Sequence, residues 1–211
     1  TTIVQDRIAQ RTGIKVEILN NSEQRFMDYK SVASKGESFR KIIEEKTAIL
    51  DIGGGSIQLS LFDNDTLVST QNVRLGVLRI QDYLNRFDVK GSQMEEVIYE
   101  MAMARLDTYE KLYLKDRGMQ NLIIVDDYLS PWAVKKNGGD SARAVLDAES
   151  FGKVFEVLRS QNPVKIATAM DIPQERIPLV FISSVLIKCI AELMGVKRIW
   201  TPGVTLCDGI A

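Results

Sequence analysis

Three consecutive glycines stand between two predicted strands, in the string DIGGGS at residues 51–56. Glycine lets the backbone adopt positive φ angles and approach a ligand closely, and successive free N–H groups form a concave anion-binding nest. We therefore predict that Gly53, Gly54, Gly55 and Ser56 bind phosphate. The simpler alternative is a hairpin turn with a capping aspartate. Two-residue hairpins favour Asn-Gly or Asp-Gly, however, and do not need three glycines.

The surrounding sequence excludes two other phosphate-binding motifs. No Gly-Lys-Ser/Thr follows the glycines, as a Walker loop requires, and the next element is a strand rather than the helix of a Rossmann fingerprint. Asp51 stands at the end of the first strand, where we predict that its carboxylate holds a metal ion or a metal-bound water. Mg²⁺ that binds together with phosphate usually needs only one or two protein carboxylates.

The chain contains no histidine. This excludes a Ser-His-Asp or Cys-His mechanism within its 211 residues, and any histidine-ligated metal site. Proton transfer must then use a carboxylate, a lysine, a tyrosine or water. The two cysteines, Cys189 and Cys207, have no ligand partner at metal spacing, which indicates reduced thiols in a cytoplasmic protein rather than a disulfide framework or a zinc site.

Composition and charge are those of an ordinary globular protein, with 45% hydrophobic and 26% charged residues and a net charge of -1. A duplex-binding domain usually carries a strong basic excess, whereas no basic run here is longer than the two residues of Lys135-Lys136, so we expect no nucleic acid partner. We also expect no membrane span, because the most apolar run, Ile177–Met194, is interrupted by Pro178, Lys188 and Glu192.

The two ends of the chain suggest a longer parent protein. The sequence begins at Thr1 without a methionine, shows no secretory leader, and stops at Ala211, where a helix is expected to begin. We expect both ends to be cut from a longer chain.

The hydrophobic pattern predicts three consecutive strands, at residues 47–52, 56–62 and 66–74, joined by tight turns into an antiparallel meander. A short strand is also predicted at Lys15–Leu19, where apolar residues alternate, and one long amphipathic helix at 92–115. The remaining predicted elements are helices at 2–10, 23–34, 77–84, 129–134, 150–159, 163–170 and 174–194, and strands at 122–125 and 196–200.

This order of elements predicts an α/β fold, a mixed sheet whose faces are covered by helices. A meander followed by helix–strand crossovers is the organisation of a ribonuclease-H-like lobe of the actin-like ATPase type. No repeat or composition shift marks a second domain, so we predict that residues 1–211 form a single lobe.

The residues 51–59, DIGGGSIQL, resemble the second phosphate-binding motif of the Ppx/GppA phosphatases, DIGGGSTEL. Three other segments resemble that family in the same order, namely 12–18, Arg74-Leu75-Gly76 and 172–199. The resemblance implies an actin-like, two-lobed hydrolase that removes a terminal phosphate from polyphosphate or guanosine pentaphosphate with Mg²⁺. It also implies that the first lobe is absent from this chain, that half of the cleft is therefore present, and that the protein forms a homodimer.

The sequence departs from the family at the residues implied to handle the proton. An ungapped comparison places Gln24 where the family has its catalytic glutamate, whereas a one-residue gap would place Glu23 there. Gln58 replaces the glutamate of DIGGGSTEL. A neutral amide does not accept a proton from water, and loss of a general base typically costs about 10²–10⁴-fold in rate. A catalytically weak or silent member that binds phosphate or a nucleotide is therefore the alternative function.

Other residues leave alternatives open. Arg74 is predicted either to clamp phosphate bidentately or to be a solvated residue at a strand end. Asp126 and Asp127 stand where the family has a further phosphate loop, and we expect them to cap the following helix. A sugar kinase or ATPase lobe of the actin-like type is a third, less favoured function, since those proteins also use an acidic strand end and a glycine turn.

Overall fold

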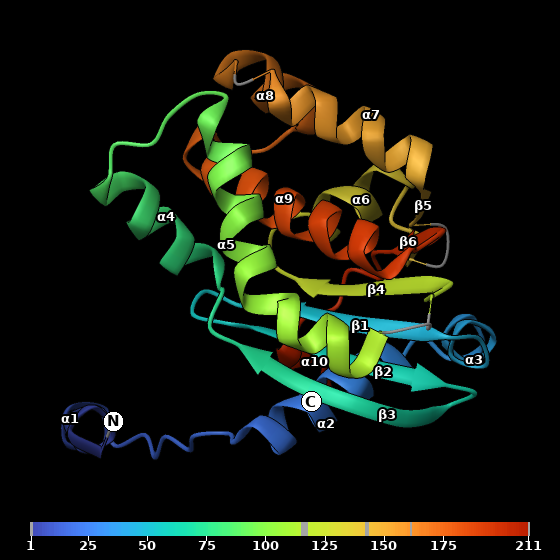
Figure 1. The fold of residues 1–211 in the computed structure, drawn as a ribbon. Helices are drawn as coiled ribbons and strands as arrows, with labels where there is room; N and C mark the ends of the chain where they lie inside the picture. The colour runs from blue at the N-terminus through green and yellow to red at the C-terminus, as the bar shows by residue number, and fades with distance from the viewer. Residues whose placement is uncertain (1, 115–117, 142–143, 161, 211) are drawn as a thin grey trace.

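The computed structural model describes residues 2–114, 118–141, 144–160 and 162–210. Its centre is a six-stranded mixed sheet with the strand order β3-β2-β1-β4-β6-β5 (Figure 1). β1 is parallel to β4 and β4 to β6, whereas β2, β3 and β5 run antiparallel to their neighbours. The strands are β1 (Thr47–Ile52), β2 (Ile57–Asp63), β3 (Thr66–Val73), β4 (Asn121–Asp126), β5 (Val145–Asp147) and β6 (Arg198–Trp200). The predicted α/β fold and meander are confirmed.

Helices cover both faces of this sheet. The α-helices are α1 (Thr2–Thr12), α2 (Asn21–Ala33), α3 (Glu37–Ile43), α4 (Val77–Arg86), α5 (Gln93–Tyr109), α6 (Ser130–Lys136), α7 (Ala148–Arg159), α8 (Pro163–Met170), α9 (Ile177–Met194) and α10 (Leu206–Ile210). Shorter π- and 3₁₀-helical segments lie at Glu110–Leu114 and Gln174–Arg176.

Alternation along the strands divides the core in two. Leu50, Leu59 and Ile124 belong to the larger cluster, with residues of α5 and α9, whereas Ile49 and Phe62 belong to the smaller one, with residues of α2 and α3. Because successive side chains of a strand point to opposite faces, β1, β2, β4 and β6 contribute to both clusters. Figure 1 shows α5 and α9 on one side of the sheet and α2 and α10 on the other. The side chain of Asp51 accordingly lies on the face that α2 covers.

The apolar run near the C-terminus forms the core helix α9. Contrary to the sequence prediction, the stretch Gln174–Met194 is long and apolar enough to cross a membrane. In the fold, 67% of the tested window is buried, and α9 packs against α4, α5 and α7. A buried core helix passes the same test of length and hydropathy, so the stretch needs no membrane to account for its composition.

Several predicted elements differ from the structure. The strand predicted at Lys15–Leu19 is wrong: this segment is irregular and mostly exposed, because no strand of the described chain lies beside it to complete a ladder. The helix α3 and the edge strand β5 were not predicted. The long helix predicted at 92–115 is α-helical only to Tyr109 and continues as a π-helix to Leu114, and Lys115 lies outside the described residues.

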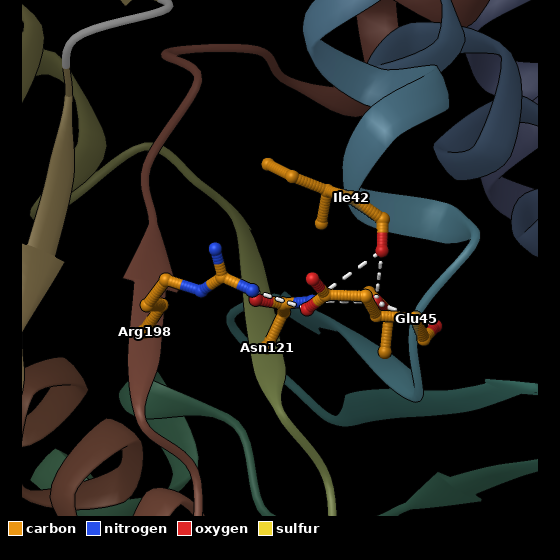
Figure 2. A network of polar contacts seen from close by, with 5 residues as sticks. Ile42, Glu45, Asn121 and Arg198 are labelled. Atoms are coloured by element: carbon orange, nitrogen blue, oxygen red, sulfur yellow. Dashed lines mark hydrogen bonds and ion pairs between the residues drawn. The ribbon is translucent and has the colours of Figure 1, made fainter.

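A polar network fastens the amino ends of the parallel strands (Figure 2). The Nδ2 atom of buried Asn121 donates to the Ile42 carbonyl, to Oε2 of Glu45 and to Oγ1 of Thr47, at 3.3, 3.0 and 3.2 Å. Arg198 forms an ion pair with Glu45. The network ties α3 to β1, β4 and β6 at the end of the sheet opposite the glycine loop.

Candidate functional site

The glycine loop, residues 53–56, connects β1 to β2 at the carboxyl end of β1. The N-terminus of α4 packs directly on it: the N–H groups of Val77 and Leu78 donate to the Gly53 and Gly54 carbonyls at 3.1 and 3.0 Å. The Gly53 N–H donates to the Ser56 carbonyl at 3.0 Å. Within the described chain, no hydrogen bond occupies the N–H groups of Gly54 and Gly55, and these two donors can therefore bind an anion.

The glycines are needed for close approach rather than for positive φ. None of Gly53, Gly54 and Gly55 has a positive φ, so the loop does not use the positive φ angles that glycine allows. A Cβ on Gly76 would lie 2.3 Å from the Gly54 carbonyl oxygen and 2.4 Å from the Gly55 nitrogen, whereas a Cβ on Gly55 would meet nothing within 4 Å. The arrangement leaves open space on the side of the loop where Gly55 lies.

Two amide–carboxylate pairs lie at the ends of β1 and β2 that the loop joins. Gln24 Nε2 donates to Oδ2 of Asp51 at 2.5 Å, and Gln58 Nε2 donates to Oδ2 of Asp28 at 3.2 Å. Gln24 and Asp28 are one turn apart on α2, and Gln58 is the direct cross-strand partner of Asp51. The tertiary structure thus brings Gln24, Gln58 and Asp51 together as predicted and adds Asp28, which the sequence analysis missed. The sequence position of Asp28, four residues after Gln24, could have indicated that both side chains lie on the same face of the helix, because residues i and i+4 share a helix face.

Burial changes the acidity of both carboxyl groups. Asp28 is 3% exposed and Asp51 8%. Burial and the neighbouring Asp51 raise the pKa of Asp28 from 3.8 to about 8, against the hydrogen bond from Gln58, which lowers it. Burial raises the pKa of Asp51 from 3.8 to about 6; the hydrogen bond from Gln24 opposes this, and the charges of Asp126 and Asp127 add to it. The site therefore holds two neighbouring buried carboxyl groups, and neither forms an ion pair with a basic side chain of the described residues.

These raised pKa values predict that metal-free protein loses stability as the pH rises. In the unfolded chain both carboxyl groups ionise near 3.8, whereas the folded chain keeps their protons up to about 6 and 8. The folded state therefore binds more protons between these values, and stability falls from about pH 4 to pH 8. We expect Tm in EDTA to drop by roughly 5 °C between pH 5 and pH 8.5. Asp28→Asn should remove much of this drop, and an equal drop in that variant would contradict the assignment to Asp28.

The other predicted site residues have different surroundings. Glu23 is exposed and completes a capping box at the start of α2: its Oε2 accepts from the Asn20 N–H at 2.8 Å, and the Asn20 side chain accepts from the Glu23 N–H at 3.0 Å. Gln24, rather than Glu23, is the residue that faces Asp51, as the ungapped comparison predicted. Ser56 lies in the loop, where its Oγ accepts from Asn72 Nδ2 at 3.3 Å.

Two arginines lie near the loop. Arg74 lines a groove of about 300 Å³ between β3 and α5, together with Arg105 and Asn72. Arg79, which was not predicted, lies on the first turn of α4, and its Nε donates to the Gly55 carbonyl at 3.2 Å. Its position three residues after Gly76 is the kind of spacing that places a side chain over the preceding loop. Arg79 is thus the arginine in direct contact with the glycine loop.

Asp126 accepts hydrogen bonds at the start of α6, as the sequence predicted, whereas no such bond to the Asp127 side chain is formed among the described residues. The Asp126 carboxylate accepts from the N–H groups of Leu129 and Ser130 at 2.9 and 2.8 Å, and from the Ser183 hydroxyl at 3.0 Å. Three donors satisfy this buried carboxylate. It is therefore a structural group at the border of the site.

The residues of the two amide–carboxylate pairs fit a Mg²⁺ site that phosphate and water complete. Among the described residues no group of three His, Cys, Asp or Glu side chains is placed to hold a metal ion. Asp51 and Asp28 nevertheless offer two neighbouring carboxylates, and Oδ1 of Asp28 is buried without a hydrogen-bond partner. One or two carboxylates are the usual protein contribution to Mg²⁺ that is shared with phosphate.

The chain is similar to known proteins in its sequence profile and in its fold. The sequence profile of the Ppx/GppA phosphatase family matches residues 3–199, and no curated protein sequence matches the chain. The fold is similar to an exopolyphosphatase from Cytophaga hutchinsonii, with 17% identity, a TM-score of 0.76, and coverage of 99% of this chain and 68% of that one. It is also similar to the Aquifex aeolicus Ppx/GppA family member, with 12% identity, a TM-score of 0.73, and coverage of 99% and 67%. On the match over residues 3–199, the chain belongs to the Ppx/GppA phosphatase family.

Proposed function

We propose that this protein is a Mg²⁺-dependent phosphohydrolase that releases the terminal phosphate of polyphosphate or guanosine pentaphosphate. The observation that carries the proposal is the glycine loop, which follows β1 two residues after the buried Asp51 and whose Gly54 and Gly55 N–H groups have no hydrogen-bond partner within the described chain. Water attacks the terminal phosphorus and the bond from phosphorus to the bridging oxygen breaks. The bridging oxygen stays on a chain one unit shorter, orthophosphate leaves, and the proton lost by the attacking water passes to solvent.

The residues of this chain have distinct parts in that reaction. The Gly54 and Gly55 N–H groups bind the oxygens of the terminal phosphate, and the guanidinium of Arg79 adds positive charge beside them. Asp51 would hold Mg²⁺, which when bound neutralises phosphate charge. Gln24 keeps the Asp51 carboxylate oriented through its 2.5 Å hydrogen bond.

A groove beside the loop supports an extended phosphate chain as substrate. The groove begins at Asn72, which contacts Ser56 of the loop, and is lined by Arg74 and Arg105. Neither guanidinium forms a hydrogen bond or an ion pair with another described residue. Phosphates that follow the terminal one would meet two unpaired positive charges there, which favours polyphosphate over a compact substrate.

A second lobe of the same protein would complete the cleft. We place the protein in the cytoplasm, where both of its thiols stay reduced. The chain spans about two thirds of the length of its structural neighbours. Helix α1 has no buried residue and lies apart from the sheet (Figure 1). Apolar side chains along this N-terminal arm are exposed, at Ile3, Val4, Ile14, Ile18 and Phe26. Such a row of exposed apolar residues favours contact with another protein surface, which we assign to the first lobe rather than to a homodimer partner.

The test is orthophosphate release by the intact protein from long-chain polyphosphate and from guanosine pentaphosphate with Mg²⁺. We expect release that falls at least about 100-fold in Asp51→Asn, because the amide keeps the shape but loses the charge at the loop. Asp63→Asn, an exposed change at the far end of β2, is the matched control and should leave the rate unaltered.

A silent, phosphate-binding regulatory protein is the second candidate function. The amides of Gln24 and Gln58 favour it, because both donate hydrogen bonds to carboxylates and neither accepts a proton. Binding of either substrate without any phosphate release, at all Mg²⁺ concentrations, would establish this function and exclude the phosphohydrolase.

A further inference from the structure

Asp28 stands out among the buried polar groups. Its side chain is 3% exposed, and its Oδ1 is the single buried side-chain nitrogen or oxygen, within the described residues, that has no hydrogen-bond partner. Its other oxygen accepts from Gln58 at 3.2 Å. An unsatisfied buried polar atom is costly, and an unsatisfied charged one more so, so an oxygen left free in this position indicates a ligand.

The surroundings of Asp28 supply no positive charge. The described ion pairs include neither Asp28 nor Asp51 nor Asp126. Asp51 lies close enough to raise the free energy of the charged form of Asp28. Two neighbouring buried carboxylates without a basic partner need a cation or a proton to neutralise them.

The two amides leave one oxygen of each carboxylate available. Gln24 engages Oδ2 of Asp51 and Gln58 engages Oδ2 of Asp28, and no hydrogen bond to either Oδ1 is formed within the described chain. The glutamines thereby orient the carboxylates, as groups behind a metal ligand commonly do.

We propose that Asp28 and Asp51 together bind one divalent cation. Asp51 is the first carboxylate ligand and Oδ1 of Asp28 the second, since the amides of Gln24 and Gln58 offer no carboxylate. Mg²⁺ and Mn²⁺ both bind to carboxylate oxygens, and water and substrate phosphate complete their coordination. The proposal deepens the proposed function and rests on it for the choice of Mg²⁺.

The experiment is a titration of the intact, substrate-free protein with Mn²⁺, in which electron paramagnetic resonance measures the free ion. We expect one bound Mn²⁺ in the unmodified protein, at least about tenfold weaker binding in Asp28→Asn and in Asp51→Asn, and no change in Asp63→Asn. Mg²⁺ should displace the bound Mn²⁺. Thermal unfolding in EDTA shows whether each variant is folded, and Asp28→Ser is a second variant that removes the carboxylate without adding volume.

Two results would overturn the proposal: Mn²⁺ affinity unaltered in both folded Asp28 variants, or no Mn²⁺ binding by the unmodified protein at millimolar concentration. The outcome is separable from that of the proposed function. If Mn²⁺ binding depends on Asp28 but no phosphate is released from any substrate, only the proposed phosphohydrolase function is contradicted. Phosphate release together with Mn²⁺ binding that is unaltered in the Asp28 variants would contradict only the assignment of Asp28 as a metal ligand.

Discussion

Replacing Gln24 by glutamate is expected to raise the rate of phosphate release by about 10²–10⁴-fold. The side chain of residue 24 already reaches Asp51, at 2.5 Å, and it lies at the border of the buried site rather than inside it. A carboxylate in this position can accept the proton of the attacking water, which the amide cannot. Release of orthophosphate from polyphosphate under saturating Mg²⁺ measures the effect.

The same substitution should destabilise the protein when no cation is present. The new carboxylate at position 24 would face Asp51 without the hydrogen bond that the amide donates, and two like charges close together in a buried site repel. Tm in EDTA should therefore fall, and Mg²⁺ should restore it. Gln24→Met, which fills the same space without a polar group, is the matched control and should not raise the rate.

The same rate measurement tests the alternative that Glu23 is the general base. Glu23 is exposed and engaged in the cap of α2, so Glu23→Gln should cost the helix cap about 1 kcal/mol or less and leave Gln24→Glu active. If Gln24→Glu, Gln58→Glu and the double variant all leave the rate unchanged, the two glutamines are not what limits catalysis. A large loss on Glu23→Gln would transfer the role of base to Glu23.

Gly76→Ala is expected to abolish phosphate binding and to lower the free energy of unfolding by about 1–3 kcal/mol. The added Cβ would lie 2.3–2.4 Å from the backbone atoms of Gly54 and Gly55, where no flexible side chain can move aside. The N-terminus of α4 and the loop would have to separate, which breaks the hydrogen bonds from Val77 and Leu78. Denaturant unfolding and calorimetry with inorganic phosphate or tripolyphosphate measure the two effects.

Gly55→Ala is the matched control for the loss of stability. Its Cβ would enter open space and its φ is not positive, so stability should change by less than about 1 kcal/mol. Phosphate binding should weaken, because the methyl group occupies the side on which the anion approaches. A Gly76→Ala protein that is as stable as the parent and binds phosphate normally would show that the contact between α4 and the loop does not shape the site.

Local patterns in the sequence determined the centre of the fold. The alternating residues of β2 and the apolar run of β1 predicted the meander, because side chains on a strand have a period of two and the intervening turns are short. Helix α9 is also determined locally, because most of its residues are apolar and require burial. The place and type of the glycine loop also followed from the residues themselves, as did the absence of any histidine chemistry.

Segments whose structure depends on a distant partner were not predictable in this way. Lys15–Leu19 alternates as a strand does, yet it has no neighbouring strand, within the described residues, to pair with. The edge strand β5 is the reverse case: its three residues carry too short a pattern, and pairing with β6 makes them a strand. A strand is stabilised by its ladder, so its presence is decided by chain segments far away in the sequence.

The site shows the same division. From the sequence came Asp51, the glycines and the unusual amides Gln24 and Gln58. Only the tertiary structure could assign Asp28, because its role depends on how α2 packs beneath the sheet. α10 holds that helix so closely that a Cβ on Gly209 would lie 2.0 Å from the Met27 carbonyl oxygen. Local sequence determines which residues share a helix face or a strand face; long-range packing decides which buried carboxylates then meet.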